Sequence, residues 1–164
     1  MIVAVPIYSW FDIRNNPIQN FTYSEILPMI RLGNEKVAEE FARIITSRID
    51  FDTFFDNQDD LDELISYSGG SPQQLIRLVN TALTFSYGQT ITSDIVEKTI
   101  NKTGRRMYET LTSEHIEVIK AGHYENADEP TLDLLFWLAI LKYNGHRELN
   151  PLLRRFFNDG TSAD

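Results

Sequence analysis

A chain of 164 residues, of which 42% are hydrophobic, can bury one compact core or two small ones, which excludes a disordered polypeptide. Its formal net charge of -9 repels phosphate backbones, so we expect no general coating of nucleic acid. Because cysteine is absent, disulfides, thiol nucleophiles and thiolate metal sites are excluded, and a reducing compartment is favoured. The longest apolar run, Leu134 to Leu141, is far shorter than the ~20 residues of a membrane span. No signal-peptide pattern follows Met1, so we expect a cytoplasmic protein without a membrane partner.

Residues 1–33 contain two short apolar runs that suit strands. Ile2 to Ile7 is rich in β-branched residues and ends in an aromatic and polar stretch, which is typical of a buried strand. The second run, Ile26 to Leu32, contains Pro28, which cannot donate to a ladder, so this run fits only an edge strand. Since two short strands do not make a stable sheet alone, we expect other elements to cover them.

Residues 34–107 show helical periodicity, and we expect them to form a four-helix unit. Asn34 is a good N-cap for the first helix, which extends to Arg48. Seven acids and no bases follow between Asp50 and Glu63, which we interpret as a solvated connection whose last acids favour the start of the next helix. A calcium loop is excluded, because Phe54 occupies the third ligand position and the turn glycine is absent.

The next helix has the clearest boundaries in the chain. Ser68-Gly69-Gly70 tolerates positive φ and ends the helix that precedes it. Ser71 is a suitable cap, and Pro72 suits the first helical position, where its missing N–H costs nothing. Apolar residues then line one face until Gly88, which predicts a helix over this range.

Two further helices are predicted before residue 120. One begins near residues 92–93 and extends to Met107, and Gly104 weakens its end. Leu111 to Glu114 then form a cap for a short helix that runs through Ile119.

Residues 108–164 combine a helix, a link, a second helix and a hairpin-like turn, which suits a small winged-helix-like domain. The second helix, Leu132 to Leu141, is apolar on nearly all sides, with Asp133 as its only charge, so we expect it to be buried in the domain or against another protein. Tyr143 to His146 supplies the hairpin turn through Asn-Gly. A DNA-reading helix needs exposed basic side chains, so DNA is not an expected partner.

No motif in the sequence supports catalysis or metal binding. The three histidines, His115, His123 and His146, have no partners at metal-ligand spacing, and no serine lies in a Gly-x-Ser-x-Gly motif. Neither type of glycine-rich phosphate loop is present, and no apolar strand ends in an Asp-Glu pair that could hold magnesium. The remaining candidate is the helix start at Gly69 to Gln74, whose N–H groups favour an anion or a polar ligand.

The order of these features resembles the C-terminal part of P-loop ATPases of the AAA+ and STAND kind. Such a region contains a late core strand, an edge strand that would end here at Leu27 to Ile30, a helical lid and a winged helix. Within the lid, Ser68 to Pro72 followed by Leu75 to Leu78 is similar to the nucleotide-facing helix of the family. Tyr143 to Gly145 followed by Pro151 to Leu153 is similar to a tail in a bacterial branch of these ATPases, which implies a bacterial source.

The resemblance implies that five residues form the lid side of a nucleotide site: Gly70, Ser71, Pro72, Gln73 and Arg77. Gly70-Ser71-Pro72 matches the Gly-x-Pro turn of the lid, which approaches the nucleotide from the side opposite the phosphate loop. In related lids an arginine just after this turn senses the terminal phosphate. Here Gln73 occupies that position and Arg77 follows one turn later. Glutamine can hydrogen-bond to a phosphate but cannot neutralise its charge.

The resemblance therefore implies a mainly α chain with three parts. Residues 1–33 would be strand remnants of an α/β ATPase core, residues 34–107 a four-helix lid and residues 108–164 the winged-helix-like domain. The chain would cover ATP, held with magnesium by a core absent from this chain, and relay the nucleotide state to a protein partner through the winged helix. It lacks Walker A and Walker B motifs, so we expect no enzyme activity and no cofactor in the chain alone. Ser9 could match a polar sensor and Arg14 a trans-acting arginine, but a turn residue and a solvated loop residue are the favoured interpretations.

Two other functions remain open from the sequence. A stand-alone helical and winged-helix protein–protein adaptor would need the same apolar helix but no nucleotide. A winged-helix DNA regulator is disfavoured by the charge, because Arg105-Arg106 and Arg154-Arg155 are too few to reverse the acidic balance.

Overall fold

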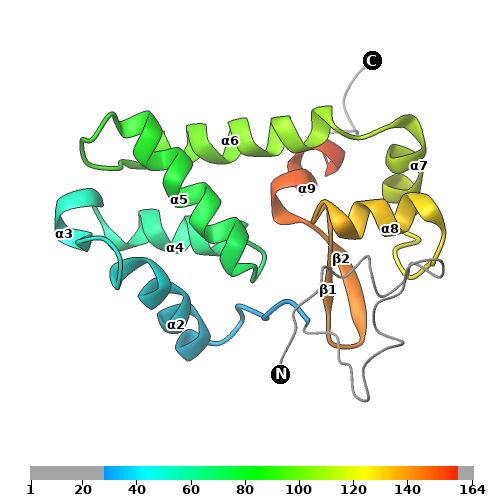
Figure 1. The fold of residues 1–164 in the computed structure, drawn as a ribbon, viewed down its shortest axis with the longest axis horizontal. Coiled ribbons are helices and arrows are strands. Elements are labelled where there is room, and N and C mark those ends of the chain that lie inside the picture. Colours follow the sequence, from blue (N-terminus) through cyan, green and yellow to red (C-terminus); the bar gives the residue numbers. More distant parts are fainter. Residues whose placement is uncertain (1–27, 159–164) are drawn as a thin grey trace, which may run out of the picture. The chain divides into compact units, whose positions relative to one another are not determined.

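The computed structural model describes residues 28–158, of which 63% lie in helices and 8% in strands (Figure 1). The protein is therefore mainly α, as the sequence predicts. The predicted strand from Ile2 to Ile7 lies outside the described residues, and so do Ser9 and Arg14.

The described residues divide into two compact units. The helical unit comprises residues 29–110 together with 150–158, and the hairpin unit comprises residues 111–149. The C-terminal helix thus packs with the helices that precede residue 111. This differs from the predicted division, which grouped that helix with the rest of residues 108–164.

The helical unit contains these helices: α2 (Glu35–Thr46), α3 (Phe51–Phe54), α4 (Gln58–Tyr67), α5 (Pro72–Ser86), α6 (Ser93–Glu109) and α9 (Pro151–Asn158). Four of them, α2, α4, α5 and α6, are the helices predicted between residues 34 and 107. Residues 28–33 form no strand, so the edge strand predicted for Ile26 to Leu32 is wrong for the described part of that run. The reason is that the Ile30 N–H donates to the carbonyl oxygen of Gly70, in a turn, and not to a neighbouring strand.

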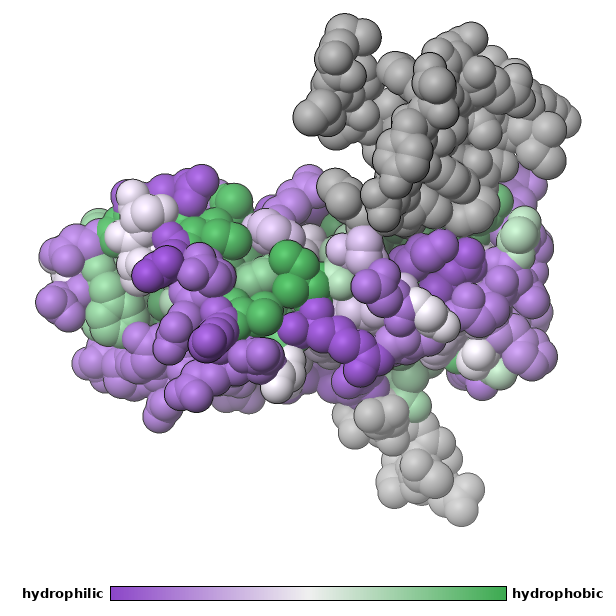
Figure 2. Space-filling view, turned by 90° about the horizontal axis from the view of Figure 1, so that it is seen from below, coloured by the Kyte–Doolittle hydropathy of each residue, from purple (hydrophilic) through white to green (hydrophobic). Residues whose placement is uncertain are grey.

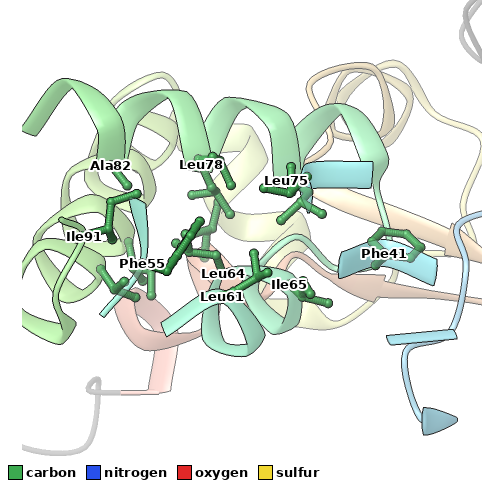
Figure 3. Packing of buried hydrophobic residues seen from close by; sticks show 14 residues of the cluster. Phe41, Phe55, Leu61, Leu64, Ile65, Leu75, Leu78, Ala82 and Ile91 are labelled. Atoms are coloured by element: carbon green, nitrogen blue, oxygen red, sulfur yellow. The ribbon is translucent and has the colours of Figure 1, made fainter. Parts of the chain in front are cut away.

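A cluster of buried apolar side chains holds the helical unit together. Leu75 and Leu78 of α5 lie over Leu61, Leu64 and Ile65 of α4 (Figure 3). Full burial of one such side chain stabilises the fold by about 1.5–3 kcal/mol. The cluster consists of Phe41, Ile45, Phe55, Leu61, Leu64, Ile65, Leu75, Leu78, Val79, Ala82, Ile91, Val96, Ile100 and Leu152.

The acidic segment Asp50 to Glu63 is more ordered than a solvated connection. It contains α3 and the start of α4, and an isolated parallel bridge joins Phe55 to Ile91. The carboxylate of Asp60 is buried and accepts a hydrogen bond from Ser93 Oγ at 2.8 Å. The other acids of the segment are exposed, and the surface on the side of α2 and α3 is largely hydrophilic, with some hydrophobic residues between the polar ones (Figure 2). The prediction of a solvated connection is therefore wrong for Asp60 and for the residues of α3, whereas the acids expected at the start of the next helix are confirmed by Asp59 and Asp60 in the first turn of α4.

Gly104 lies inside α6 and does not weaken its end, because the helix continues to Glu109. This glycine is buried, and helix α9 packs against α6 (Figure 1). A Cβ atom at this position would be 2.5 Å from the Leu152 carbonyl oxygen and 2.9 Å from a ring carbon of Phe156. The missing side chain thus allows the backbones of the two helices to come close.

The hairpin unit contains α7 (Ser113–Ala121), α8 (Glu129–Phe136), β1 (Ile140–Tyr143) and β2 (His146–Leu149). The two strands are antiparallel, and Tyr143 pairs with His146 across the turn at Asn144 and Gly145. The predicted cap at Leu111 to Glu114 is confirmed, since the Thr112 hydroxyl accepts the His115 N–H.

The apolar run Leu132 to Leu141 is only partly helical, which corrects the predicted helix. Helix α8 ends at Phe136, and Leu138 follows with a left-handed φ of 58°. Ile140 and Leu141 are buried in β1. A continuous apolar run fits both a buried helix and a buried strand. Here the end of the run pairs with β2 and so forms a strand of the hairpin.

Candidate functional site

The candidate site is the turn between α4 and α5, where the sequence places Gly70, Ser71 and Pro72. Ser68 ends α4, and its hydroxyl donates to the Ile65 carbonyl oxygen at 2.6 Å and accepts the Gly70 N–H at 3.3 Å. Gly69 and Gly70 have φ values of 60° and 77°, in the left-handed region that favours glycine. The predicted helix stop and glycine turn are therefore confirmed.

Gly70 is also a point of close contact with the segment that precedes α2. The Ile30 N–H donates to the Gly70 carbonyl oxygen at 3.3 Å. A Cβ atom on Gly70 would lie only 1.7 Å from the Ile30 carbonyl oxygen. Glycine is thus required here both by φ and by the approach of another backbone segment. Neither local pattern nor spacing signals this contact, because the two residues lie far apart in the sequence.

Ser71 and Pro72 start α5 as the sequence predicts. The Ser71 side chain is buried and accepts the N–H of Gln74 at 3.2 Å, and Pro72 occupies the first helical position. The Ser71 hydroxyl oxygen is used in this helix cap, so its role is structural. Gln74 is buried beside it, which leaves the exposed side of the helix start to Pro72 and Gln73.

Gln73 and Arg77 are both exposed and lie one turn apart on α5. Residues at this spacing share one face of a helix, with Cβ atoms about 6 Å apart. An amide and a guanidinium next to a helix N-terminus can donate several hydrogen bonds to an anionic or polar ligand. The structure thus brings Gln73 and Arg77 together on one surface. Gly70 and Ser71, in contrast, serve the turn and the cap.

His115 is the most buried of the three histidines, in the hairpin unit. Its Nδ1 accepts the Thr112 N–H at 3.1 Å, its Nε2 lies 3.8 Å from Asp133 Oδ2, and its ring meets Trp137 edge-on. The Thr112 and His115 contacts are reciprocal, so they form a capping box at the start of α7. This geometry supports a structural role for the histidine.

Asp128 caps α8 in the same unit. Its Oδ1 accepts the Thr131 N–H at 3.0 Å. Hydrogen bonds from the side chain and the backbone of Thr131 lower the pKa of the Asp128 carboxyl below its ordinary value. This carboxylate is exposed and engaged in a cap, which explains its shifted pKa without a catalytic role.

Two aromatic side chains at the end of α8 were not predicted as an exposed pair. Phe136 is 47% exposed and Trp137 is 39% exposed. The sequence placed both inside a helix that is apolar on nearly all sides and was expected to be buried in the domain or against another protein. No local signal separates them, because Leu134 and Leu135, which precede them in the same apolar run, are buried.

Within residues 28–158, no three histidine or acidic side chains gather closely enough to hold a metal ion. In the same part of the chain, no helix has the length and hydrophobicity needed to cross a membrane. No protein-family model, no curated protein and no solved structure matches this chain.

Proposed function

We propose that this chain is the lid and winged-helix region of an AAA+/STAND-like ATPase, which covers ATP bound by a core absent from this chain. The observation that carries the proposal is the start of α5. There a buried Gly70-Ser71 turn precedes a helix whose exposed face presents Gln73 and Arg77. The proposal is further supported by a four-helix arrangement before residue 110 and by a helix–helix–hairpin unit after it.

In this proposal the helix start contacts the nucleotide through side-chain donors. The Gln73 amide would hydrogen-bond to a phosphate or ribose oxygen, and the Arg77 guanidinium would supply the positive charge that Gln73 lacks. The described residues offer donors that fit ATP, but they offer no carboxylate cluster for magnesium. The core would therefore hold the metal, and the chain alone would not hydrolyse ATP.

The contact between Ile30 and Gly70 gives the proposed lid a way to transmit its position. The turn that would face the nucleotide is hydrogen-bonded to the segment leading into α2. A small movement of the α5 start would therefore move Ile30 as well. The winged-helix-like part would present the nucleotide state to a protein partner.

The first test of this proposal is the coding sequence upstream of Met1. An in-frame phosphate loop and an acidic strand there support it. An in-frame stop codon, combined with native expression of this chain, contradicts it. ATP turnover by the purified chain that is abolished by substitution of Gly70 or Pro72 would also contradict it.

The second test measures ATP affinity in the complete protein that the reading frame encodes. We expect Arg77→Ala to weaken ATP binding about 10-fold, because a charge-assisted hydrogen bond is lost. Gln73→Arg, which restores the family residue, should strengthen binding. Arg43→Ala is the matched control, since Arg43 is also exposed on a helix and pairs with Glu40 at 2.9 Å. Equal losses in the Arg77 and Arg43 variants would refute the assigned site.

A stand-alone protein–protein adaptor is the second candidate, and the exposed pair Phe136 and Trp137 favours it. Aromatic side chains often anchor protein interfaces. In an adaptor, Phe136→Ala would abolish capture of the partner, whereas Arg77→Ala would leave it unchanged. In a nucleotide-dependent lid, both changes would reduce capture of the partner in the presence of ATP.

A further inference from the structure

A groove in the helical unit lies between the end of α4 and the start of α9. Its volume is about 360 Å³, and it is lined by Ser66, Tyr67, Pro151, Arg154 and Arg155. Two of these residues carry guanidinium groups, two carry hydroxyl groups, and none carries an acid. The groove thus concentrates positive charge and hydrogen-bond donors in a chain whose net charge is -9.

Arg155 is held in position by two other helices. One of its terminal nitrogens donates to Asn101 Oδ1 of α6, and the other donates to the Tyr67 hydroxyl at 3.5 Å. Its guanidinium also lies 5.7 Å from the centre of the Tyr67 ring. These contacts orient the Arg155 side chain before any ligand arrives. A guanidinium has five N–H donors, so some of them remain for a ligand.

Arg154, which precedes Arg155 on α9, is exposed, and so is Ser66 at the end of α4. The packing of α9 on α6 at Gly104 places these arginines beside α4. In the sequence, Arg154-Arg155 is only a small basic pair. The fold gives the pair hydroxyl partners and a concave surface.

A second groove, along α6, differs from the first in the charges of its lining residues. The second groove is lined by Asp94, Glu97, Lys98, Asn101, Lys102 and Arg105. It carries two acids and three bases along one helix, and Arg105 pairs with Glu109 at 3.0 Å. Mixed charges of this kind neutralise each other locally, so this groove has little preference for an anion.

We propose that the groove between α4 and α9 binds a small phosphate-bearing anion. Two guanidiniums match the several acceptor oxygens of a phosphate group, and arginine binds such groups with paired hydrogen bonds. The hydroxyls of Ser66 and Tyr67 supply further donors to the same oxygens. This site is independent of the proposed lid function, since it uses neither Gln73 nor Arg77.

The experiment titrates the ¹⁵N-labelled 164-residue chain with inorganic pyrophosphate at constant ionic strength and follows the backbone amide signals. We expect saturable shifts at Ser66, Tyr67 and residues 152–155. Arg154→Gln should weaken binding about 10-fold, because one charge-assisted contact is removed from an exposed position. Arg155→Gln should weaken it as well, and its unfolding midpoint shows whether the loss of the Tyr67 and Asn101 contacts also destabilises the fold.

Arg105→Gln is the matched control, because it removes the same charge from the neighbouring groove. Binding within about twofold of the wild type is expected for this variant, since screening by salt weakens distant surface charges. The proposal is overturned if the amides of the groove do not respond to pyrophosphate, if chloride at equal ionic strength shifts them equally, or if Arg105→Gln weakens binding as much as Arg154→Gln. Failure here would leave the lid proposal intact, because the measurement needs no ATPase core.

Discussion

The helical unit and the hairpin unit both bury apolar side chains, but close backbone contacts are found in the first and polar contacts between loops and strands in the second. In the helical unit, apolar side chains fill the core, and two glycines let backbones meet at Ile30 and at Leu152. In the hairpin unit, polar contacts connect the loops to the helices and strands. Arg147 of β2, for example, donates to the carbonyl oxygens of Tyr124 and Asn126 at 2.7 and 2.8 Å.

This difference predicts opposite sensitivities. Where two backbones touch, an added methyl group is harmful, because a packed interior has no room for it. Where a side chain satisfies backbone groups, removal of atoms is harmful, because a donor or an acceptor loses its partner. Each unit can therefore be tested at its own kind of contact, the first by an added methyl group and the second by a removed hydrogen-bond partner.

The largest effect is expected for Gly70→Ala. The new Cβ would meet the Ile30 carbonyl oxygen, and the φ of 77° is unfavourable for alanine. We expect the free energy of unfolding of the helical unit to fall by about 3 kcal/mol, with about 1–2 kcal/mol from φ and the rest from displacement of the backbone. Hydrogen exchange at Ile30 and at the start of α5 should increase in the same variant.

Gly88→Ala is the control for this change. Gly88 has a φ of 80°, and a Cβ there would have no neighbour within 4 Å. It should therefore show only the cost of φ, about 1–2 kcal/mol. Equal destabilisation by the two substitutions would show that the Ile30 contact contributes nothing to stability.

Gly104→Ala is expected to destabilise the helical unit by about 1–2 kcal/mol. The added methyl would meet the Leu152 carbonyl oxygen and the Phe156 ring, and this outweighs the gain of about 1 kcal/mol that alanine brings to a helix interior. Denaturant unfolding followed by circular dichroism measures the change. Gly33→Ala, at a position with open space, should change stability little. A stabilised Gly104→Ala variant would contradict close packing of α9 on α6.

In the hairpin unit we expect His115→Ala to cost about 1–2 kcal/mol. The substitution removes the acceptor for the Thr112 N–H and the ring contact with Trp137. His115→Gln is the matched variant, because glutamine is a preferred partner at this position of a capping box. It should recover part of the loss, measured as amide protection at Thr112 and along α7. No recovery would indicate that burial of the ring is the dominant contribution.

Local signals in the sequence predicted much of this fold. Asn34 and Ser71 were identified as caps and residues 111–114 as a third cap, and the side chains of Asn34, Ser71 and Thr112 each accept a backbone N–H. Gly69 and Gly70 were identified as a helix stop, and both have positive φ. These features depend on residues within one turn of each other, so periodicity and cap chemistry are sufficient to find them.

The features that the sequence did not reveal depend on distant contacts. Ile30 approaches Gly70, and Arg155 reaches Tyr67 and Asn101, only after the helices have packed. The hydrogen bond from Ser93 to the buried Asp60 likewise joins two helices. For the candidate site, the turn was predictable from Gly-Ser-Pro. The close approach of Ile30 to Gly70 was not predictable, because no local pattern encodes a contact between distant residues.

The smallest effect is expected at Asp128, the polar cap of α8 in the hairpin unit. Its carboxyl has a lowered pKa in the folded protein, so the unfolded chain binds the proton more readily. The contribution of the charged cap is therefore present above about pH 4, the ordinary pKa range of aspartate, and is lost as the pH falls through the folded value. Asp128→Asn keeps a good capping side chain but cannot titrate. The difference in unfolding midpoint between wild type and Asp128→Asn should thus shrink as the pH is lowered from 5 to 3. A difference that stays constant over this range would show that the cap acts through its hydrogen bond to Thr131 and not through its charge.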